Sequence, residues 1–490
     1  MRPLSLGLVV LLSTLSAAAQ PTVSIQLNPP SSMDAEMRST WTAVFTNLTN
    51  APLEDVPYYI SSQPSTIAVR PEGCGGNFAE RVDCRIDLPA GGSREISFTT
   101  RNLVPTGHFG VVMAASLHGA MRYDEAVIGR EFFVTTKADA GRGSLRQALT
   151  DINASCDASV PCIASFRIDE PSTEDGLYFI TLHSPLPEIT APDVFIDGGA
   201  QIRRKGNSLN RPLIVLDGGA AGQANGLVFR GTYARATDLS VTQFRENGIE
   251  THASSSMLLR NFLVSNGSRG VVCVGGPAYV ADNVLSGNGR SGGFFWTTSY
   301  IRVLRNIVDG NGASGLFFHK PVATKYDYSE AIDNVIRGNA HAGIGLSLMA
   351  TGDFARNSFA DNGGRPIDIG LDGPSTSGVR GYPGRGGVAG APAIVAARFA
   401  NGVTTLTVRP APYLLDGAVS FIRLSIYAGS GDAQELIATV DARFSTDFTI
   451  DIARDLRGQL VRAAMVTNAI ENFDDPMITT SEVGEGTVVF

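Results

Sequence analysis

Aromatic and basic side chains gather in one short part of this chain, where they could hold a ligand. They are Phe294, Trp296, Phe317, His319, Lys320, Lys325 and Tyr326. Aromatic faces stack on sugar rings, while lysine and histidine hydrogen-bond hydroxyls or pair with the carboxylates of acidic sugars. We therefore expect these residues to form a carbohydrate-binding surface.

The last of these residues lie in an irregular part of the chain. Residues 320–330, KPVATKYDYSE, make one step of the surrounding repeat five residues longer than the step before it. A longer loop could add side chains to a binding surface, or it could fold over the aromatic residues and bury them. The sequence leaves both interpretations open.

Patterns that indicate catalysis are weak in this sequence. A glycoside hydrolase needs two carboxylates roughly 5–10 Å apart, and a polysaccharide lyase needs a base near a carboxylate-neutralising group. His319 with Lys320 is a candidate base pair for elimination. We expect the aspartates of the repeat to be isolated turn residues in contact with solvent at the corners of the coils. They are Asp282, Asp309, Asp333 and Asp353. The six histidines are scattered and no CxxC pair occurs, so we expect no metal site and no cofactor.

A repeated phrase surrounds the aromatic residues. Within residues 257–363 it reads RNFLVSNG, DNVLSGNG, RNIVDGNG, DNVIRGNA and RNSFADNG, and its first asparagines are spaced 22, 23, 28 and 23 residues apart. These asparagines are Asn261, Asn283, Asn306, Asn334 and Asn357. A second asparagine follows each of them at a constant interval. Such self-similarity indicates stacked units that cannot bury their apolar faces alone.

The alternation around each first asparagine indicates what the unit is. Leu259 and Leu263 flank Asn261 at a period of two, which predicts a strand with the asparagine on the core side. Identical amides one strand apart can hydrogen-bond to each other, so we expect an inward asparagine ladder. Leucine-rich repeats have a similar period but need a helical return, which is missing. The repeat predicts a parallel β-helix.

A second strand in each coil determines which side chains face outward. Alignment on Gly270, Gly292 and Gly315 predicts that Phe294 lies above Phe317, and Trp296 above His319, on the outer surface. The consecutive glycines 292 and 293 leave a slip of one residue open, which would turn Phe294 and Trp296 inward.

The segment before the repeat predicts a helix over 143–154. Ser144 is a suitable N-cap, and Leu145, Ala148, Leu149 and Ile152 share one face. The run from Val134 to Ala148 resembles the CSLREA-type N-terminal domain of bacterial right-handed parallel β-helix (PbH1-repeat) proteins, and ITLHSPLPEIT from Ile180 carries a second motif of that family. The resemblance implies a right-handed β-helix over 131–373 whose first coil is covered by the helix.

Strand-rich segments flank the repeat on both sides. Residues 20–130 alternate short apolar strands with turns, which is typical of an immunoglobulin-like β-sandwich. Through Trp41, Phe45 and Asn47 they also resemble β-sandwich modules of bacterial surface proteins. After a linker at 374–390, residues 391–490 predict a second β-sandwich. The predicted fold class is all-β, a right-handed parallel β-helix flanked by two β-sandwich domains.

The beginning of the chain and its cysteines predict export. Residues 1–19 have the charged start, apolar stretch and small-residue end of a signal peptide. In an oxidising compartment we expect two local disulfides, Cys74–Cys84 and Cys156–Cys162, with Cys273 inside the coil. The net charge of −8 disfavours a nucleic-acid partner. No later apolar stretch is long enough to predict a membrane-spanning helix.

These features predict an extracellular, cell-surface or periplasmic protein that binds polysaccharide or the surface of another cell. Many right-handed β-helix proteins modify polysaccharides, so the resemblance also implies an alternative, an enzyme of lyase or epimerase type. A structural spacer or secreted passenger is a third interpretation. The outward aromatic residues and the inserted segment are the features that distinguish these three functions.

Overall fold

The computed structural model describes residues 22–30, 32–63, 66–78, 81–102, 107–115, 120–205, 211–297, 300–320, 328–347, 350–370, 392–409, 419–429, 435–442, 447–470, 476–481, 483 and 486–490. The predicted signal peptide and the predicted linker at 374–390 lie outside these residues. So do Lys325 and Tyr326.

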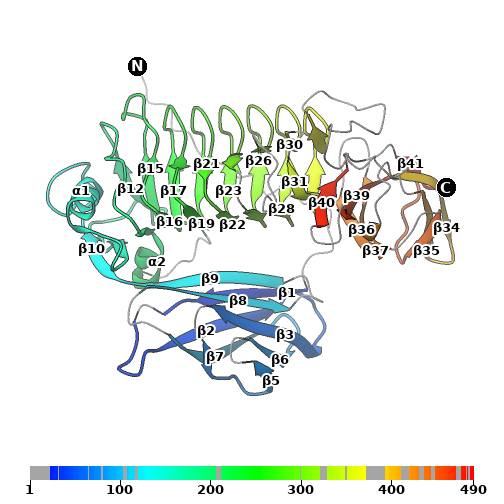
Figure 1. Ribbon diagram of the computed structural model, residues 1–490, viewed down its shortest axis with the longest axis horizontal. Helices are drawn as coiled ribbons and strands as arrows, with labels where there is room; N and C mark the ends of the chain where they lie inside the picture. The colour runs from blue at the N-terminus through cyan, green and yellow to red at the C-terminus, as the bar shows by residue number, and fades with distance from the viewer. Residues whose placement is uncertain are drawn as a thin grey trace.

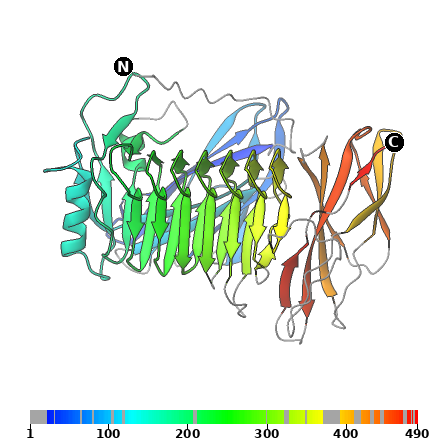
Figure 2. The ribbon, with the colours of Figure 1, turned by 90° about the horizontal axis from the view of Figure 1, so that it is seen from above.

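A right-handed parallel β-helix forms the middle of the molecule, with three sheets along its sides (Figures 1 and 2). Sheet I contains β10 (Arg130–Val134), β11 (Cys162–Phe166), β13 (Val194–Asp197), β16 (Tyr233–Thr237), β19 (Ser255–Leu259), β22 (Ala278–Ala281), β25 (Ile301–Leu304), β28 (Tyr328–Ile332) and β31 (Thr351–Asp353). Sheet II contains β12 (Tyr178–Thr181), β14 (Ile214–Asp217), β17 (Leu239–Thr242), β20 (Phe262–Val264), β23 (Val284–Ser286), β26 (Ile307–Asp309), β29 (Val335–Arg337) and β32 (Ser358–Ala360). Sheet III contains β15 (Leu227–Phe229), β18 (Ile249–Thr251), β21 (Val271–Gly275), β24 (Gly293–Thr297), β27 (Leu316–His319), β30 (Ile344–Leu346) and β33 (Ile367–Ile369).

The first asparagine of each phrase lies at a corner between sheets I and II. The residue before it has a left-handed backbone, with φ of 54° at Arg260 and 59° at Asp282. This conformation turns the chain and ends the sheet I strand, so the prediction of one strand running through the asparagine is wrong. As a result Leu259 faces outward, in a small apolar cluster separate from the core that contains Leu258 and Leu263.

The asparagines form two continuous ladders inside the coil. The Nδ2 of Asn283 donates to Oδ1 of Asn306 at 3.0 Å, and Asn306 donates to Asn334 at 2.9 Å. Each Nδ2 also donates to a main-chain carbonyl, as Asn306 does to Val280 at 2.9 Å, and each Oδ1 accepts a main-chain N–H. Apart from Asn362 at the end of the second ladder, these asparagines are at most 1% exposed. Because donors and acceptors are satisfied by the neighbouring coils, these buried polar groups stabilise the stack.

Opposite charges alternate along the same corner, and all of them except Asp238 come immediately before a first asparagine. The order is Asp238, Arg260, Asp282, Arg305, Asp333 and Arg356. Arg260 pairs with Asp238 and Arg305 with Asp282, each at 2.9 Å. Asp282 and Asp333 were expected to be isolated and solvated, and this is wrong because the neighbouring coils bring arginines beside them. Asp309 likewise pairs with Arg337, and Asp353 is buried within β31.

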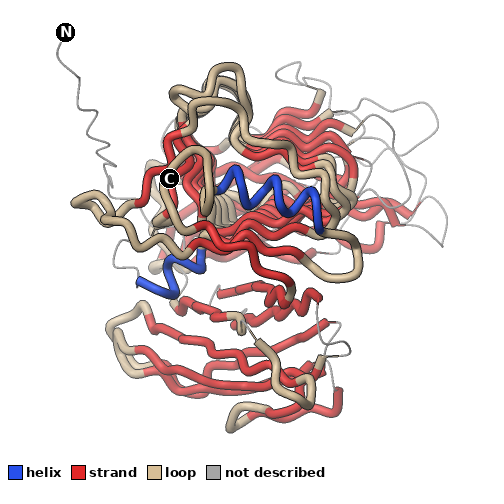
Figure 3. Tube along the Cα trace, turned by 90° about the vertical axis from the view of Figure 1, so that its left-hand side faces the viewer, coloured by secondary structure: helices blue, strands red, loops and turns tan. Residues whose placement is uncertain are grey.

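Helix α1 (Leu145–Ser155) lies across the first coil, as Figure 3 shows from that end. Ser144 is its N-cap, and its apolar face joins the core of the β-helix. The disulfide Cys156–Cys162 joins the end of α1 to β11. A second helix, α2 (Gly199–Lys205), was not predicted, because its segment was interpreted as part of a coil. Neither described helix is long and apolar enough to cross a membrane.

The N-terminal module consists of two antiparallel sheets around one core. One sheet contains β1 (Val23–Asn28), β2 (Arg38–Asn47), β7 (Ser93–Arg101) and β4 (Thr66–Val69). The other contains β5 (Cys74–Phe78), β6 (Arg81–Leu88), β3 (Leu53–Gln63), β8 (Gly107–Ala115) and β9 (Ala120–Ile128), with a disulfide between Cys74 and Cys84. Only Gly129 separates β9 from β10, and a Cβ there would lie 2.1 Å from the carbonyl oxygen of Pro161. This close approach fixes how the module joins the β-helix.

The C-terminal module covers the last coil. It contains β34 (Ala393–Ala400), β35 (Val403–Arg409), β36 (Val419–Gly429), β37 (Glu435–Ala442), β38 (Phe448–Ile452), β39 (Leu460–Ile470), β40 (Pro476–Thr480) and β41 (Thr487–Val488). Tyr427 and Val466 of this module are part of the β-helix core, and Arg423 pairs with buried Asp353 at 3.3 Å. Both ends of the solenoid are therefore covered, as stacked repeats require.

The ladder predicts a position-dependent cost for losing an asparagine. Asn311 bonds to Asn288 on one side and to Asn339 on the other, so Asn311→Ala should lower the free energy of unfolding by about 3 kcal/mol, since buried partners are left unpaired. Asn362 is the last rung and bonds only to Asn339 and Ile336, so Asn362→Ala should cost about 1 kcal/mol. Chemical denaturation of both variants measures the difference, and equal losses would contradict the ladder.

The C-terminal cover predicts a second contrast. Val466 is 1% exposed where the module meets the last coil, so Val466→Asp should destabilise the protein by about 3 kcal/mol or more, because an unpaired carboxylate is buried. Val395 is 39% exposed in the same module, and Val395→Asp should change stability by about 0.5 kcal/mol or less. Thermal unfolding of the two variants tests whether this contact stabilises the solenoid.

Candidate functional site

The outer face of sheet III positions the predicted binding residues. In its parallel register Phe294 pairs with Phe317, and Trp296 pairs with His319. Phe295 and Phe318 alternate with them and face the core. The outward orientation of Phe294 and Trp296 is therefore the one observed, and the slipped register is excluded.

Four rings form one contiguous aromatic cluster, which we define as Phe294, Trp296, Phe317 and His319. The ring centroids of Phe294 and Phe317 are 5.6 Å apart, and Trp296 meets the edge of His319 at 5.4 Å. Trp296 is 47% exposed, while the other three rings are half-buried. The cluster thus presents one broad indole surface to solvent, supported by three rings packed around it.

Lys320 does not contribute to this surface. It is 2% exposed, and its main-chain N–H donates to the hydroxyl of Ser347 at 2.9 Å. It follows outward-facing His319, so strand alternation turns it inward. The structure thus places Lys320 inside rather than on the outer surface, where we expected it. Its contact with ligand and its pairing with His319 as a base stay predictions. Within the described residues Trp296 remains exposed.

Arg269 is a further residue at the cluster, and the sequence did not reveal it. Its guanidinium lies over the ring of Phe294, 4.3 Å from the ring centroid. Its Nε is buried and has no hydrogen-bond partner. Burial and, secondarily, nearby Arg290 lower the pKa of Arg269. Because Arg269 lies at a corner just before β21, the strand alternation used to choose outward residues could not find it.

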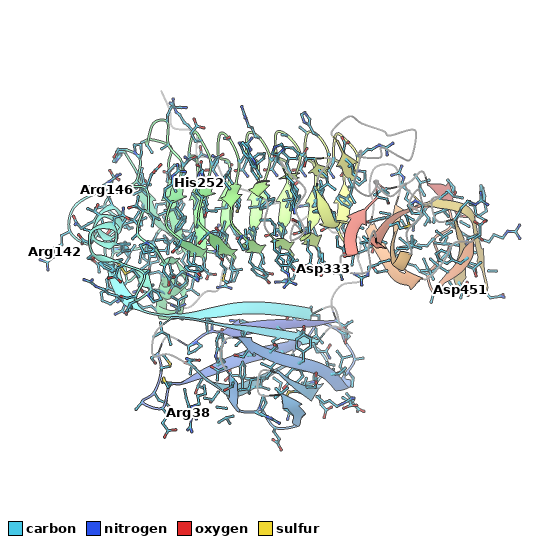
Figure 4. All side chains as sticks on the ribbon, in the orientation of Figure 1. Arg38, Arg142, Arg146, His252, Asp333 and Asp451 are labelled. Atoms are coloured by element: carbon cyan, nitrogen blue, oxygen red, sulfur yellow. A yellow bond between two sulfur atoms is a disulfide. The ribbon has the colours of Figure 1, made fainter. Side chains whose placement is uncertain are left out.

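A polar network occupies the same face two coils nearer the first coil. His252 Nε2 lies 2.7 Å from Oε1 of Glu250, whose other oxygen accepts from Asn247 at 3.0 Å. Arg230 pairs with Glu188 at 3.1 Å and lies 3.6 Å from Glu250. The register Glu250–Val272–Phe294 connects this network to the aromatic cluster. Figure 4 shows His252 on the side of the stack away from the N-terminal module.

The cavity between the N-terminal module and sheet I is a separate feature. Its volume is about 130 Å³, and it is lined by Pro29, Val127, Phe195, Asp197 and Arg235, among others. Its charged groups are paired: Arg235 with Asp193 at 2.7 Å, and Asp197 with Arg203 at 2.5 Å. All four of these residues belong to the β-helix, so the pairs line the cavity from its side. The aromatic cluster does not line this cavity.

Groups that could hold a metal ion do not occur in the described part of the chain. The aspartates of the coil corners are directed at arginines of neighbouring coils, so their oxygens are already engaged. The described surface of sheet III therefore offers aromatic stacking, the guanidinium of Arg269 and a histidine held by a carboxylate.

Comparison with known proteins identifies the class of this solenoid. The family described as "Right handed beta helix region" matches residues 225–377, which form most of the stack. A solved structure, the GH20 exo beta-N-acetylglucosaminidase from Vibrio harveyi in complex with N-acetylglucosamine, has 10% identity and a TM-score of 0.14, over 22% of this chain and 18% of that chain. That likeness carries no argument. No curated protein sequence matches this chain.

The raised pKa of Asp197 predicts that the free energy of unfolding depends on pH. Burial raises its pKa, with Arg203 opposing the shift, so its contribution to stability is complete below pH ~4 and declines as the pH rises through the folded-state pKa. Asp197→Asn removes this decline, so the variant should gain stability relative to the native protein between pH 4 and 7. Thermal unfolding across this range tests the sign, with exposed Asp175→Asn as control. A difference that is independent of pH would contradict it.

Proposed function

We propose that this chain is an exported protein of the cell surface or extracellular space that binds polysaccharide through the aromatic cluster. The observation that carries the proposal is the exposed indole of Trp296, held edge-on by His319 and Phe294 on the outer face of sheet III. Fixed aromatic rings bind sugar faces with little loss of side-chain entropy, which favours such a site.

The shape of the surface favours a chain-like ligand. Successive strands of sheet III lie about 4.8 Å apart, so outward residues of five coils form rows parallel to the solenoid axis. The rows lead from Glu250 and His252 to the aromatic cluster. An extended polymer could contact several coils at once, whereas a small compact ligand would meet no described cavity here.

An enzyme that modifies polysaccharide is the second candidate, and one contact favours it. The carboxylate of Glu250 lies 2.7 Å from His252 Nε2, an arrangement that can orient a histidine as a base. Incubation with a panel of uronic-acid polymers, monitored by the absorbance of unsaturated products, tests this activity. Product formed by the native protein and lost in His252→Ala would establish a lyase, and its absence across the panel would leave binding as the proposed function.

Export rests on the predicted signal peptide and two local disulfides. Disulfides persist in oxidising compartments, so Cys74–Cys84 and Cys156–Cys162 support a location outside the cytoplasm. Recovery of the chain from the medium or cell envelope, with its N-terminus near Gln20, is the expected result. Retention in the cytoplasm with an intact N-terminus would overturn this part of the proposal.

Trp296→Ala should weaken polysaccharide binding about tenfold or more, because the exposed stacking surface is removed. Binding to a glycan array, followed by calorimetric titration of the best polymer, measures the loss. Phe179 is 40% exposed on sheet II, outside the cluster, and Phe179→Ala is the matched control that should bind as the native protein does. Equal affinity of Trp296→Ala and the native protein would overturn the proposed site.

A further inference from the structure

Among the described residues Arg269 has no carboxylate partner, in contrast to several arginines of the solenoid. Arg230, Arg260 and Arg305 are all held by acidic residues of neighbouring coils. Arg269 packs its guanidinium on Phe294 instead, and its Nε is buried without a hydrogen-bond partner. A buried polar group without a partner costs free energy unless a ligand or water satisfies it.

The described charged groups around Arg269 include no carboxylate that is available to pair with it, so an anion would have to come from a ligand. Arg290 is a charge of the same sign that acts on Arg269 and adds to the positive potential. Glu250 is the nearby acidic group, but its oxygens already engage His252 and Asn247, with Arg230 at 3.6 Å. A free guanidinium beside a second cation is a suitable site for a carboxylate, which the planar fork can bind through two parallel hydrogen bonds.

The position of Arg269 joins this anion site to the stacking surface. Phe294 contacts the guanidinium at 4.3 Å and is packed against both Trp296, at 6.5 Å, and Phe317, at 5.6 Å. A polymer stacked on Trp296 and continuing along sheet III would thus bring a substituent near Arg269. The stacking group and the cation lie on one face, in successive coils.

We infer that the polysaccharide bound by the aromatic cluster is acidic, and that a carboxylate on one of its sugars pairs with Arg269. This inference rests on the proposed function. Arg269 then determines specificity for uronic-acid polymers, while Trp296 supplies stacking that acidic and neutral chains share. Sulfate esters offer a related anion, but the planar two-oxygen carboxylate fits the guanidinium fork better.

The experiment compares polymers that differ only in charge. Polyuronates are titrated calorimetrically beside their carboxyl-reduced counterparts, which keep the backbone and linkages, and beside a sulfated polymer. The native protein should bind the polyuronate about tenfold or more tightly than its reduced form. Arg269→Gln should reduce that preference to about twofold or less while retaining affinity for the reduced polymer. Trp296→Ala should weaken binding to both.

Two further variants make the comparison specific. Arg142 is exposed before α1, and Arg142→Gln, which removes the same charge, should keep the native preference. Arg269→Lys keeps the positive charge but loses the planar guanidinium, so it should show a reduced preference for the polyuronate. This variant replaces Arg269→Gln in the comparison if Arg269→Gln fails to fold. Circular dichroism establishes folding of each variant.

The outcomes separate this inference from the proposed function. The inference is overturned if the native protein binds the polyuronate and its reduced form equally, or if Arg269→Gln keeps the native preference. Either result leaves the proposal of polysaccharide binding intact. Tighter binding of the sulfated polymer overturns the choice of carboxylate. No binding to any polymer overturns both proposals.

Discussion

The buried asparagine amide is the constraint on which the rest of the structure depends. A carboxamide inside an apolar coil is costly unless its N–H and oxygen atoms are all satisfied. Here each amide uses the coil before it and the coil after it, as Asn306 does with Asn283 and Asn334. The five successive coils that carry the asparagines must all repeat the arrangement, which fixes their register and with it the rows of outward side chains.

A stack held in this way has two exposed ends, and the protein covers both with different elements. Helix α1 closes the first coil through its apolar face, and the C-terminal module closes the last through Tyr427 and Val466. The N-terminal module lies against sheet I, where paired charges such as Asp197 with Arg203 line the joint. Sheet III lies on the side away from that joint (Figure 4), and its exposed indole at Trp296 faces solvent.

Much of this architecture could be predicted from local patterns. The repeat interval, the alternation within strands and the aligned glycines predicted Phe294 and Trp296 outside and Phe295 inside, and the observed register excluded the one-residue slip that glycines 292 and 293 had left open. The same reasoning failed at Asn261, because the left-handed Arg260 ends one strand and begins a corner, which the period of two does not reveal. It also assigned Lys320 to the inserted segment outside the coil, whereas the structure buries this side chain directly after β27.

The sequence by itself determined the parallel β-helix and the inward asparagines, because each depends on spacing that recurs from coil to coil. For the aromatic pairs it left two registers, and the strand pairing in the structure chose the outward one. Only the tertiary structure decided that Arg269 lies on Phe294 without a carboxylate partner, and that Glu250 holds His252 on the same face. These contacts join corners and strands of successive coils. They depend on the direction of each side chain after the chain has turned, and no repeated spacing encodes that direction.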